Sequence, residues 1–191
     1  GVQTCALPIF DKKIPRLTPT AEFESNYTSD PEVYYDRIRK LKYVLHNGKR
    51  LYYPRLWRTS KICEMYNSVC CEQDLNSPHR YLEKGEKLKD YIVFDCGSAE
   101  ANFSLDVVND AKAVYLFEGD AFWKRPLQAT FHEYRDKVTL KNRFIGKKSK
   151  NELSLGEYMD YLASKGKIDF SKDDIEKLEA ELAQTQNKLE E

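Results

Sequence analysis

The sequence has no surplus of charge of either sign, because 31 Lys and Arg residues are balanced by 31 Asp and Glu residues. A neutral balance provides no bulk attraction to nucleic acid or to an anionic membrane. The chain also lacks an apolar run of the roughly 18 to 20 residues that a bilayer-spanning helix needs. We therefore expect a cytoplasmic protein with neither nucleic acid nor a membrane as partner. The locally basic stretch 37–61 suits an anionic substrate or, more simply, a solvated face.

Paired cysteine motifs are also missing. The five cysteines form no Cys-x-x-Cys pair. The adjacent Cys70 and Cys71 suit neither a zinc knuckle nor an ordinary disulfide. We expect reduced thiols and no metal site.

Four segments are expected along the chain. Residues 1–30 begin with GVQTCALPI, which resembles a translated sequencing adapter, and continue as a polar, disordered lead-in. The first nine residues are expected to contribute nothing to stability. Residues 31–90 form an N-terminal helix-and-hairpin segment, 91–176 an α/β core, and 177–191 a helical tail, expected to be truncated.

Within the N-terminal segment, Asp30-Pro31-Glu32 has the pattern of a helix start. Tyr34, Ile38 and Leu41 would provide the apolar stripe of this helix. Asn47-Gly48 lies between two β-rich runs and predicts a hairpin. A second helix is expected over residues 57–70.

In the core, two short apolar runs, 91–95 and 113–118, each close on an acid, which is typical of buried parallel strands. Their alternation with helical patterns predicts βαβ units and a mostly parallel sheet with flanking helices, incomplete at its C-terminal side. The remaining expected elements are helices at 102–108, 122–134 and 155–165, and strands at 138–140, 144–145 and 168–170.

The loop between these two strands carries the expected binding site. In doubly wound sheets, ligands bind at the carboxyl ends of the strands. Gly97 permits a tight turn after the first strand, and Glu118 closes the second strand, where its carboxylate can accept hydrogen bonds from two ribose hydroxyls. A nicotinamide dinucleotide would require G-x-G-x-x-G, yet Ala99 and Ala101 stand two and four positions after Gly97. S-adenosylmethionine has no phosphate, so the sequence favours this methyl donor.

The segments DCGSAEANFSLD (95–106) and VYLFEGD (114–120) resemble the FkbM family of S-adenosylmethionine-dependent methyltransferases. IDF (168–170), followed by Asp174 and Glu176, is similar to a later strand of that family. The resemblance extends over about residues 34–176. It implies a Rossmann-like class I methyltransferase fold and methyl transfer to a hydroxyl of a sugar or another small metabolite. Ala101 replaces a usual Gly, and Lys177 replaces the Gly after Asp-x-Glu.

The resemblance also implies roles for single residues. Gly97, Ser98 and Ala99 would line the methionine moiety through their backbone. Asp95 would hold the loop or reach the methionine ammonium. Glu118 would bind the ribose diol.

Two further roles concern carboxylates. Asp174 and Glu176 would lie near the transferred methyl as catalytic residues. Glu100 belongs to the expected cofactor-binding set, or it caps the following helix instead. Two other functions remain open: a NAD-dependent oxidoreductase and a non-catalytic Rossmann-like binding module.

Overall fold

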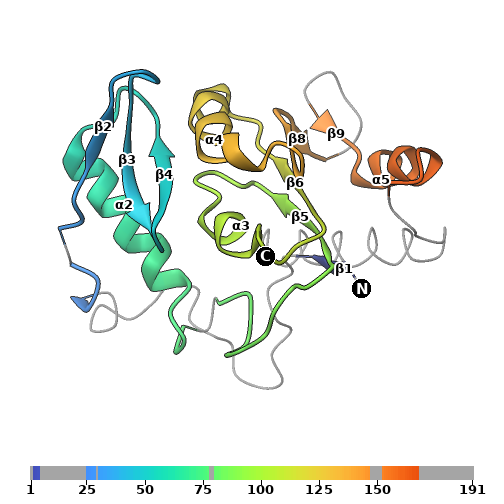
Figure 1. Ribbon diagram of the computed structural model, residues 1–191, viewed down its shortest axis with the longest axis horizontal. Coiled ribbons are helices and arrows are strands. Elements are labelled where there is room, and N and C mark those ends of the chain that lie inside the picture. Colours follow the sequence, from blue (N-terminus) through green and yellow to red (C-terminus); the bar gives the residue numbers. More distant parts are fainter. Residues whose placement is uncertain (1, 5–24, 29, 78–79, 147–151, 168–191) are drawn as a thin grey trace.

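The computed structural model describes residues 2–4, 25–28, 30–77, 80–146 and 152–167. Within these ranges the chain is a mixed α/β protein (Figure 1). A four-stranded sheet has the order β1-β5-β6-β7, and every neighbouring pair is parallel. Its strands are β1 (Val2–Thr4), β5 (Ile92–Cys96), β6 (Ala113–Phe117) and β7 (Val138–Lys141). The predicted mostly parallel sheet is confirmed, while the predicted strand at 168–170 lies outside the described residues.

Side chains alternate between the two faces of this sheet. Val93 and Val114 pack into a core with α3 (Asn102–Val107), α4 (Lys124–Thr130) and the N-terminal elements. Phe94, Tyr115 and Phe117 point to the opposite face, where they pack against α5 (Leu155–Ser164). A strand that is apolar on both sides is stable only when both faces are covered, and here helices cover both. The predicted flanking helices are therefore present.

The N-terminal elements form a second, antiparallel sheet next to α3 and α4 (Figure 1). It comprises β2 (Tyr34–Asp36), β3 (Leu41–His46) and β4 (Lys49–Tyr53), and α2 (Thr59–Glu72) follows it. The predicted hairpin is confirmed: Asn47 and Gly48 join β3 to β4 with φ angles of 51° and 78°. Two positive φ angles in succession define the two-residue turn that Asn-Gly favours.

The helix predicted to begin near residue 32 is wrong. That region forms β2, a turn and the start of β3. The Asp36 carboxylate accepts hydrogen bonds from the backbone N–H groups of Ile38 and Arg39, both at 2.9 Å, and so stabilises the turn. Ile38, which the helical stripe required to be buried, is 90% exposed. Stacked tyrosines on neighbouring strands, Tyr34 on Tyr43 at 5.3 Å, favour the sheet instead.

The first residues also depart from expectation. Val2–Thr4 forms β1 beside β5, although residues 1–30 were predicted to have no regular structure. The edge of a sheet offers unpaired N–H and C=O groups, to which an extended segment can add as a further strand. The rest of residues 1–24 lies outside the described ranges.

The other C-terminal elements match the prediction in part. The helix predicted over 122–134 is divided into α4 and two 3₁₀ turns, Ala121–Trp123 and His132–Tyr134. β8 (Phe144–Ile145) does not join the main sheet but pairs with β9 (Glu152–Leu153). In the part of the chain that the structure describes, no helix is both long and apolar enough to cross a bilayer.

The requirement for glycine in the hairpin turn can be tested directly at Gly48. We expect Gly48→Ala to lower the free energy of unfolding by about 1 kcal/mol, because a left-handed residue with a Cβ is strained. Apart from the chain neighbours of Gly48, the added methyl would meet no heavy atom of the described residues within 4 Å, so the cost is conformational. Gly48→Asn is the matched control and should lose less, since Asn tolerates this region. Urea unfolding of both variants measures the difference, and equal losses would contradict this explanation.

Candidate functional site

The loop after β5 has an unusual backbone. Gly97, Ala99 and Ala101 have φ angles of 77°, 40° and 56°, so alternate residues are left-handed. Only glycine adopts this conformation without strain, and two alanines adopt it here. Strain of this kind, stored where a loop follows a parallel strand, is characteristic of binding sites. Apart from its chain neighbours, no heavy atom of the described residues lies within 4 Å of the position that a Cβ on Gly97 would take, so open space lies next to this turn.

Hydrogen bonds hold the loop against the end of β6. The N–H groups of Gly97 and Ser98 both donate to the Phe117 carbonyl, at 2.8 and 3.2 Å. Ala101 N donates to the Ser98 carbonyl at 2.6 Å and closes the turn that begins α3. The loop is therefore attached at its start and closed on itself at its end.

Glu118, directly after β6, is the main side-chain support of this loop. Its Oε2 accepts a hydrogen bond from Ala99 N at 2.9 Å, and its Oε1 accepts one from Asp120 N at 2.7 Å. The Asn142 amide donates to the Glu118 carbonyl at 2.7 Å and fixes the backbone as well. Glu118 is only 6% exposed. Each carboxylate oxygen retains a second acceptor direction, so this residue can hold the loop and still accept from a ligand.

Asp95, on β5, also faces the start of α3. Its Oδ2 accepts a hydrogen bond from the Ser104 hydroxyl at 2.5 Å. Burial raises the pKa of Asp95 to about 6, against the opposing effect of the Ser104 hydrogen bond, and the nearby Glu118 charge raises it further. A carboxylate kept in an environment that penalises its charge is typical of functional sites.

Among the residues that the structure describes, three buried side-chain atoms have no hydrogen-bond partner: Ser98 Oγ, Glu100 Oε1 and Tyr53 Oη. Ser98 and Glu100 are neighbours in the loop, and the Glu100 charge contributes to the raised pKa of Tyr53 after burial does. Buried polar groups are rarely left unpaired, so each one needs an explanation. A bound polar ligand or water would provide the missing partners.

The carboxylates at this edge of the sheet act on one another. Burial raises the pKa of Glu100, and the charges of Glu72 and Glu118 raise it further. Within the described residues no salt bridge involves Asp95, Glu100 or Glu118. The site therefore has a negative potential, which favours a cationic ligand.

Asp95 gives a pH-dependent test. Because its folded pKa is raised, protonated Asp95 favours the folded state below pH 3.8, and this contribution is lost as the pH rises through about 6. Asp95→Asn is neutral at every pH and can still accept from Ser104. We expect it to be about 3 kcal/mol more stable than the parent at pH 7 and equal to it below pH 4. Urea unfolding at both pH values checks this, and a variant that is less stable at pH 7 would contradict it.

All six predicted cofactor residues lie together at the carboxyl ends of β5 and β6: Asp95, Gly97, Ser98, Ala99, Glu100 and Glu118. Asp174 and Glu176, predicted to be catalytic, lie outside the described residues. Tyr53, on β4, was not predicted, and no periodic signal separates it from an ordinary core tyrosine. Among the residues that the structure describes, no group of three or more His, Cys, Asp or Glu side chains is placed to hold a metal ion.

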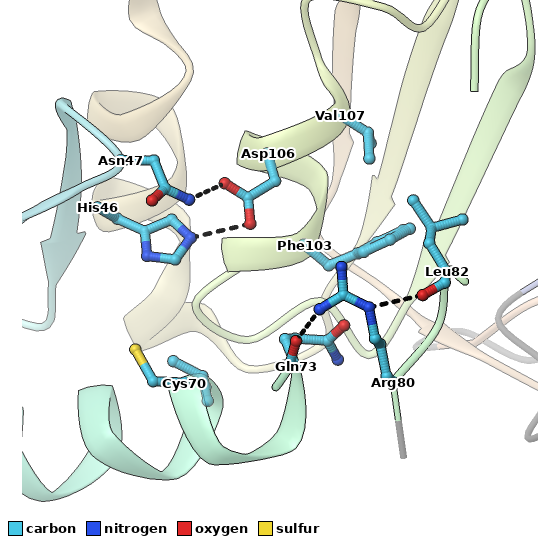
Figure 2. Close-up of a pocket in the computed structure, with 10 residues that line it drawn as sticks. His46, Asn47, Cys70, Gln73, Arg80, Leu82, Phe103, Asp106 and Val107 are labelled. Atoms are coloured by element: carbon cyan, nitrogen blue, oxygen red, sulfur yellow. Dashed lines mark hydrogen bonds and ion pairs between the residues drawn. The ribbon is translucent and has the colours of Figure 1, made fainter. Parts of the chain in front are cut away.

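The sequence also gave no sign of a second polar cluster, formed by His46, Asp106 and Cys70 (Figure 2). His46 and Asp106 are 60 residues apart, so no local motif links them.

Comparison of the chain with protein-family models, curated proteins and solved structures found no match. The functional assignment therefore depends on the geometry of the site.

Proposed function

We propose that this chain is an S-adenosylmethionine-dependent methyltransferase with a Rossmann-like class I fold, acting on a hydroxyl of a sugar or another small metabolite. The observation that carries the proposal is the left-handed loop after β5, held by a carboxylate at the end of β6. That arrangement supports a small ligand at the switch from strand to helix. The proposal agrees with the resemblance of residues 95–106 and 114–120 to the FkbM family.

The charges favour this ligand over a dinucleotide. S-adenosylmethionine carries a sulfonium and an ammonium group, and three carboxylates surround the loop: Asp95, Glu100 and Glu118. A pyrophosphate would be repelled by them. It would also require close backbone approach where Ala99 and Ala101 each carry a methyl.

The unpaired polar atoms fit the same ligand. Within the described part of the chain, Ser98 Oγ and Glu100 Oε1 have no hydrogen-bond partner. The hydroxyl can donate or accept and the carboxylate oxygen can accept, so a ligand ammonium or hydroxyl would satisfy both. Glu118 would bind ribose hydroxyls through its remaining acceptor directions. Asp95 would keep the loop in place through Ser104 and add negative charge.

When bound, S-adenosylmethionine supplies an electrophilic methyl group on sulfur. The contribution of the chain is to orient the cofactor and exclude water, because positioning accounts for most of the acceleration of a displacement. A base need only take the acceptor hydroxyl proton, a role we assign to Asp174 or Glu176.

The test is equilibrium binding of S-adenosylmethionine, S-adenosylhomocysteine and NAD, followed by turnover on a panel of hydroxylated acceptors. Binding of the two sulfur compounds with methyl transfer supports the proposal. Binding without transfer to any acceptor would favour a non-catalytic module. Binding of NAD alone would make the protein an oxidoreductase candidate and overturn the proposal.

A further inference from the structure

A cavity of about 270 Å³ lies between α2, the β3–β4 turn and α3, so its walls come from parts of the chain that are far apart in the sequence (Figure 2). None of the residues assigned to the cofactor site lines it. Pockets for drug-sized ligands have volumes of roughly 300 to 1,000 Å³, so a cavity of this size suits a smaller molecule. The chemistry of the walls indicates which class of molecule fits.

One part of the wall is apolar. It is formed by Val69 of α2, Leu82, and Phe103 and Val107 of α3. Phe103 and Val107 are four residues apart on the helix, so they lie on the same side of it. Phe103 is buried and meets Tyr81 edge to face, with 5.0 Å between the ring centroids. A ring that is held by a second ring gives a rigid surface for another aromatic group.

Arg80 provides a positive charge to the cavity and is held by two backbone carbonyls. Its Nε donates to the Leu82 carbonyl at 2.6 Å, and its Nη1 donates to the Gln73 carbonyl. Figure 2 shows the third guanidinium nitrogen, Nη2, turned away from both carbonyls. A guanidinium has more N–H groups than these two carbonyls occupy. The side chain is therefore fixed in one orientation and can still donate to a ligand.

Elsewhere in the lining, the charges of His46 and Asp106 balance each other. His46 Nε2 lies 3.1 Å from Asp106 Oδ2, and the Asn47 amide donates to Oδ1 at 2.7 Å. Burial lowers the pKa of His46, but the interactions of its ring with Asp106 and Cys70 outweigh burial and raise the pKa to about 9. Burial also opposes ionisation of Asp106, but its hydrogen bonds lower its pKa. The two form an ion pair at neutral pH, so Arg80 gives the lining a net positive charge.

We propose that this cavity is a binding site for a small aromatic carboxylate. The carboxylate accepts hydrogen bonds from Arg80 Nη2, and the ring of the ligand lies against Phe103. His46 closes the cavity without contacting the carboxylate, because its Nδ1 and Nε2 already lie within hydrogen-bond distance of Tyr66 and Asp106. A charged hydrogen bond at one end and an apolar wall along the rest orient a ligand in a small pocket. The proposal does not depend on the cofactor site.

The experiment titrates the full chain with three probes at pH 7 and follows the backbone amides by NMR. Phenylacetate carries both ring and charge, phenylacetamide keeps the shape without the charge, and acetate keeps the charge without the ring. We expect phenylacetate to bind with a dissociation constant of about 1 mM or less, and the other two at least about tenfold more weakly. Resonances of Asn47, Phe103 and Val107 should shift, whereas Met159, on the opposite face of the sheet, should not.

Two variants test the role assigned to Arg80. Arg80→Gln removes the charge and keeps a side chain that can donate hydrogen bonds. It should weaken phenylacetate binding at least about tenfold and leave phenylacetamide binding unchanged. Lys84→Gln is the matched control, because it removes the same charge from an exposed position outside the cavity lining and should change neither affinity. Circular dichroism shows whether each variant is folded.

Three results would overturn the proposal. The first is that the parent binds phenylacetate no more tightly than phenylacetamide or acetate, which requires no variant and hence no assumption about folding. The second is that the resonances shifted by phenylacetate lie away from the cavity. The third is that folded Arg80→Gln keeps the preference of the parent for phenylacetate over phenylacetamide.

Discussion

Glu118→Ala is expected to lower the free energy of unfolding by about 3 kcal/mol. Its carboxylate accepts hydrogen bonds from Ala99 N and Asp120 N, and hydrogen bonds to charged groups contribute roughly 1.5 to 3 kcal/mol each. Alanine would leave both donors without an acceptor in a region that is almost fully buried. The loop after β5, with its two left-handed alanines, would lose its main support.

Two control variants test whether the loss of stability comes from the Glu118 carboxylate itself. Glu118→Gln keeps the shape and one acceptor oxygen, so about half of the loss is expected. Asp120→Ala keeps the backbone N–H that Glu118 accepts, so little change is expected. Urea unfolding of all three variants measures this series. Equal stabilities for Glu118→Ala and the parent would mean that the loop does not depend on the carboxylate.

The contribution of His46 to stability is expected to disappear as the pH rises from about 6.5 to about 9, with a loss of about 3 kcal/mol. The folded pKa is raised above the unfolded value of 6.5, because the interactions of the His46 ring with Asp106 and Cys70 outweigh the lowering effect of burial. The proton is therefore held more tightly in the folded state. Its contribution is complete below pH 6.5 and lost as the pH rises through about 9.

Asp106→Asn isolates this effect from the ionisation of cysteine thiols in the unfolded chain. The variant keeps the shape of the side chain and removes its charge, so its stability should change much less between pH 6 and pH 9.5. Parallel urea titrations at several pH values measure both proteins. If their free energies of unfolding fall equally over this range, the His46–Asp106 pair is not the source of the dependence.

The elements that sequence predicted correctly are those with strong local signals. Asn47-Gly48 determines its turn by backbone conformation alone. α5 begins at a Ser154 side chain that accepts from Glu157 N, and after it Gly166 has a φ of 62°. The strands β5 and β6 are continuous apolar runs because both of their faces are covered by helices.

The elements that were predicted wrongly depend on contacts between residues far apart in the sequence. Tyr34, Ile38 and Leu41 have helical spacing, but the tyrosines of β2 and β3 stack across strands and Ile38 stays in solvent. β1 pairs with β5 in parallel, a pairing that the sequence pattern did not predict. Tertiary context overrides propensity in both cases.

The sequence predicted which residues form the candidate site, but not the hydrogen bonds and contacts between them. Gly97 and Glu118 follow from their positions after apolar runs. The hydrogen bond from Ala99 N to Glu118 depends on how the loop folds back on β6. The effect of the Glu100 charge on the pKa of Tyr53 depends on the packing of β4. The cavity at His46 combines three separate elements and had no sequence signal.

Calorimetric titration of the full chain and of Glu118→Ala tests the central claim most directly. The parent should bind S-adenosylmethionine and S-adenosylhomocysteine and give no binding heat with NAD. Glu118→Ala, if circular dichroism shows it folded, should bind the sulfur compounds more weakly, by about ten- to a hundredfold or more, because charged hydrogen bonds to ribose would be lost. Unchanged affinity in Glu118→Ala, or binding of NAD in place of S-adenosylmethionine, would contradict the assignment.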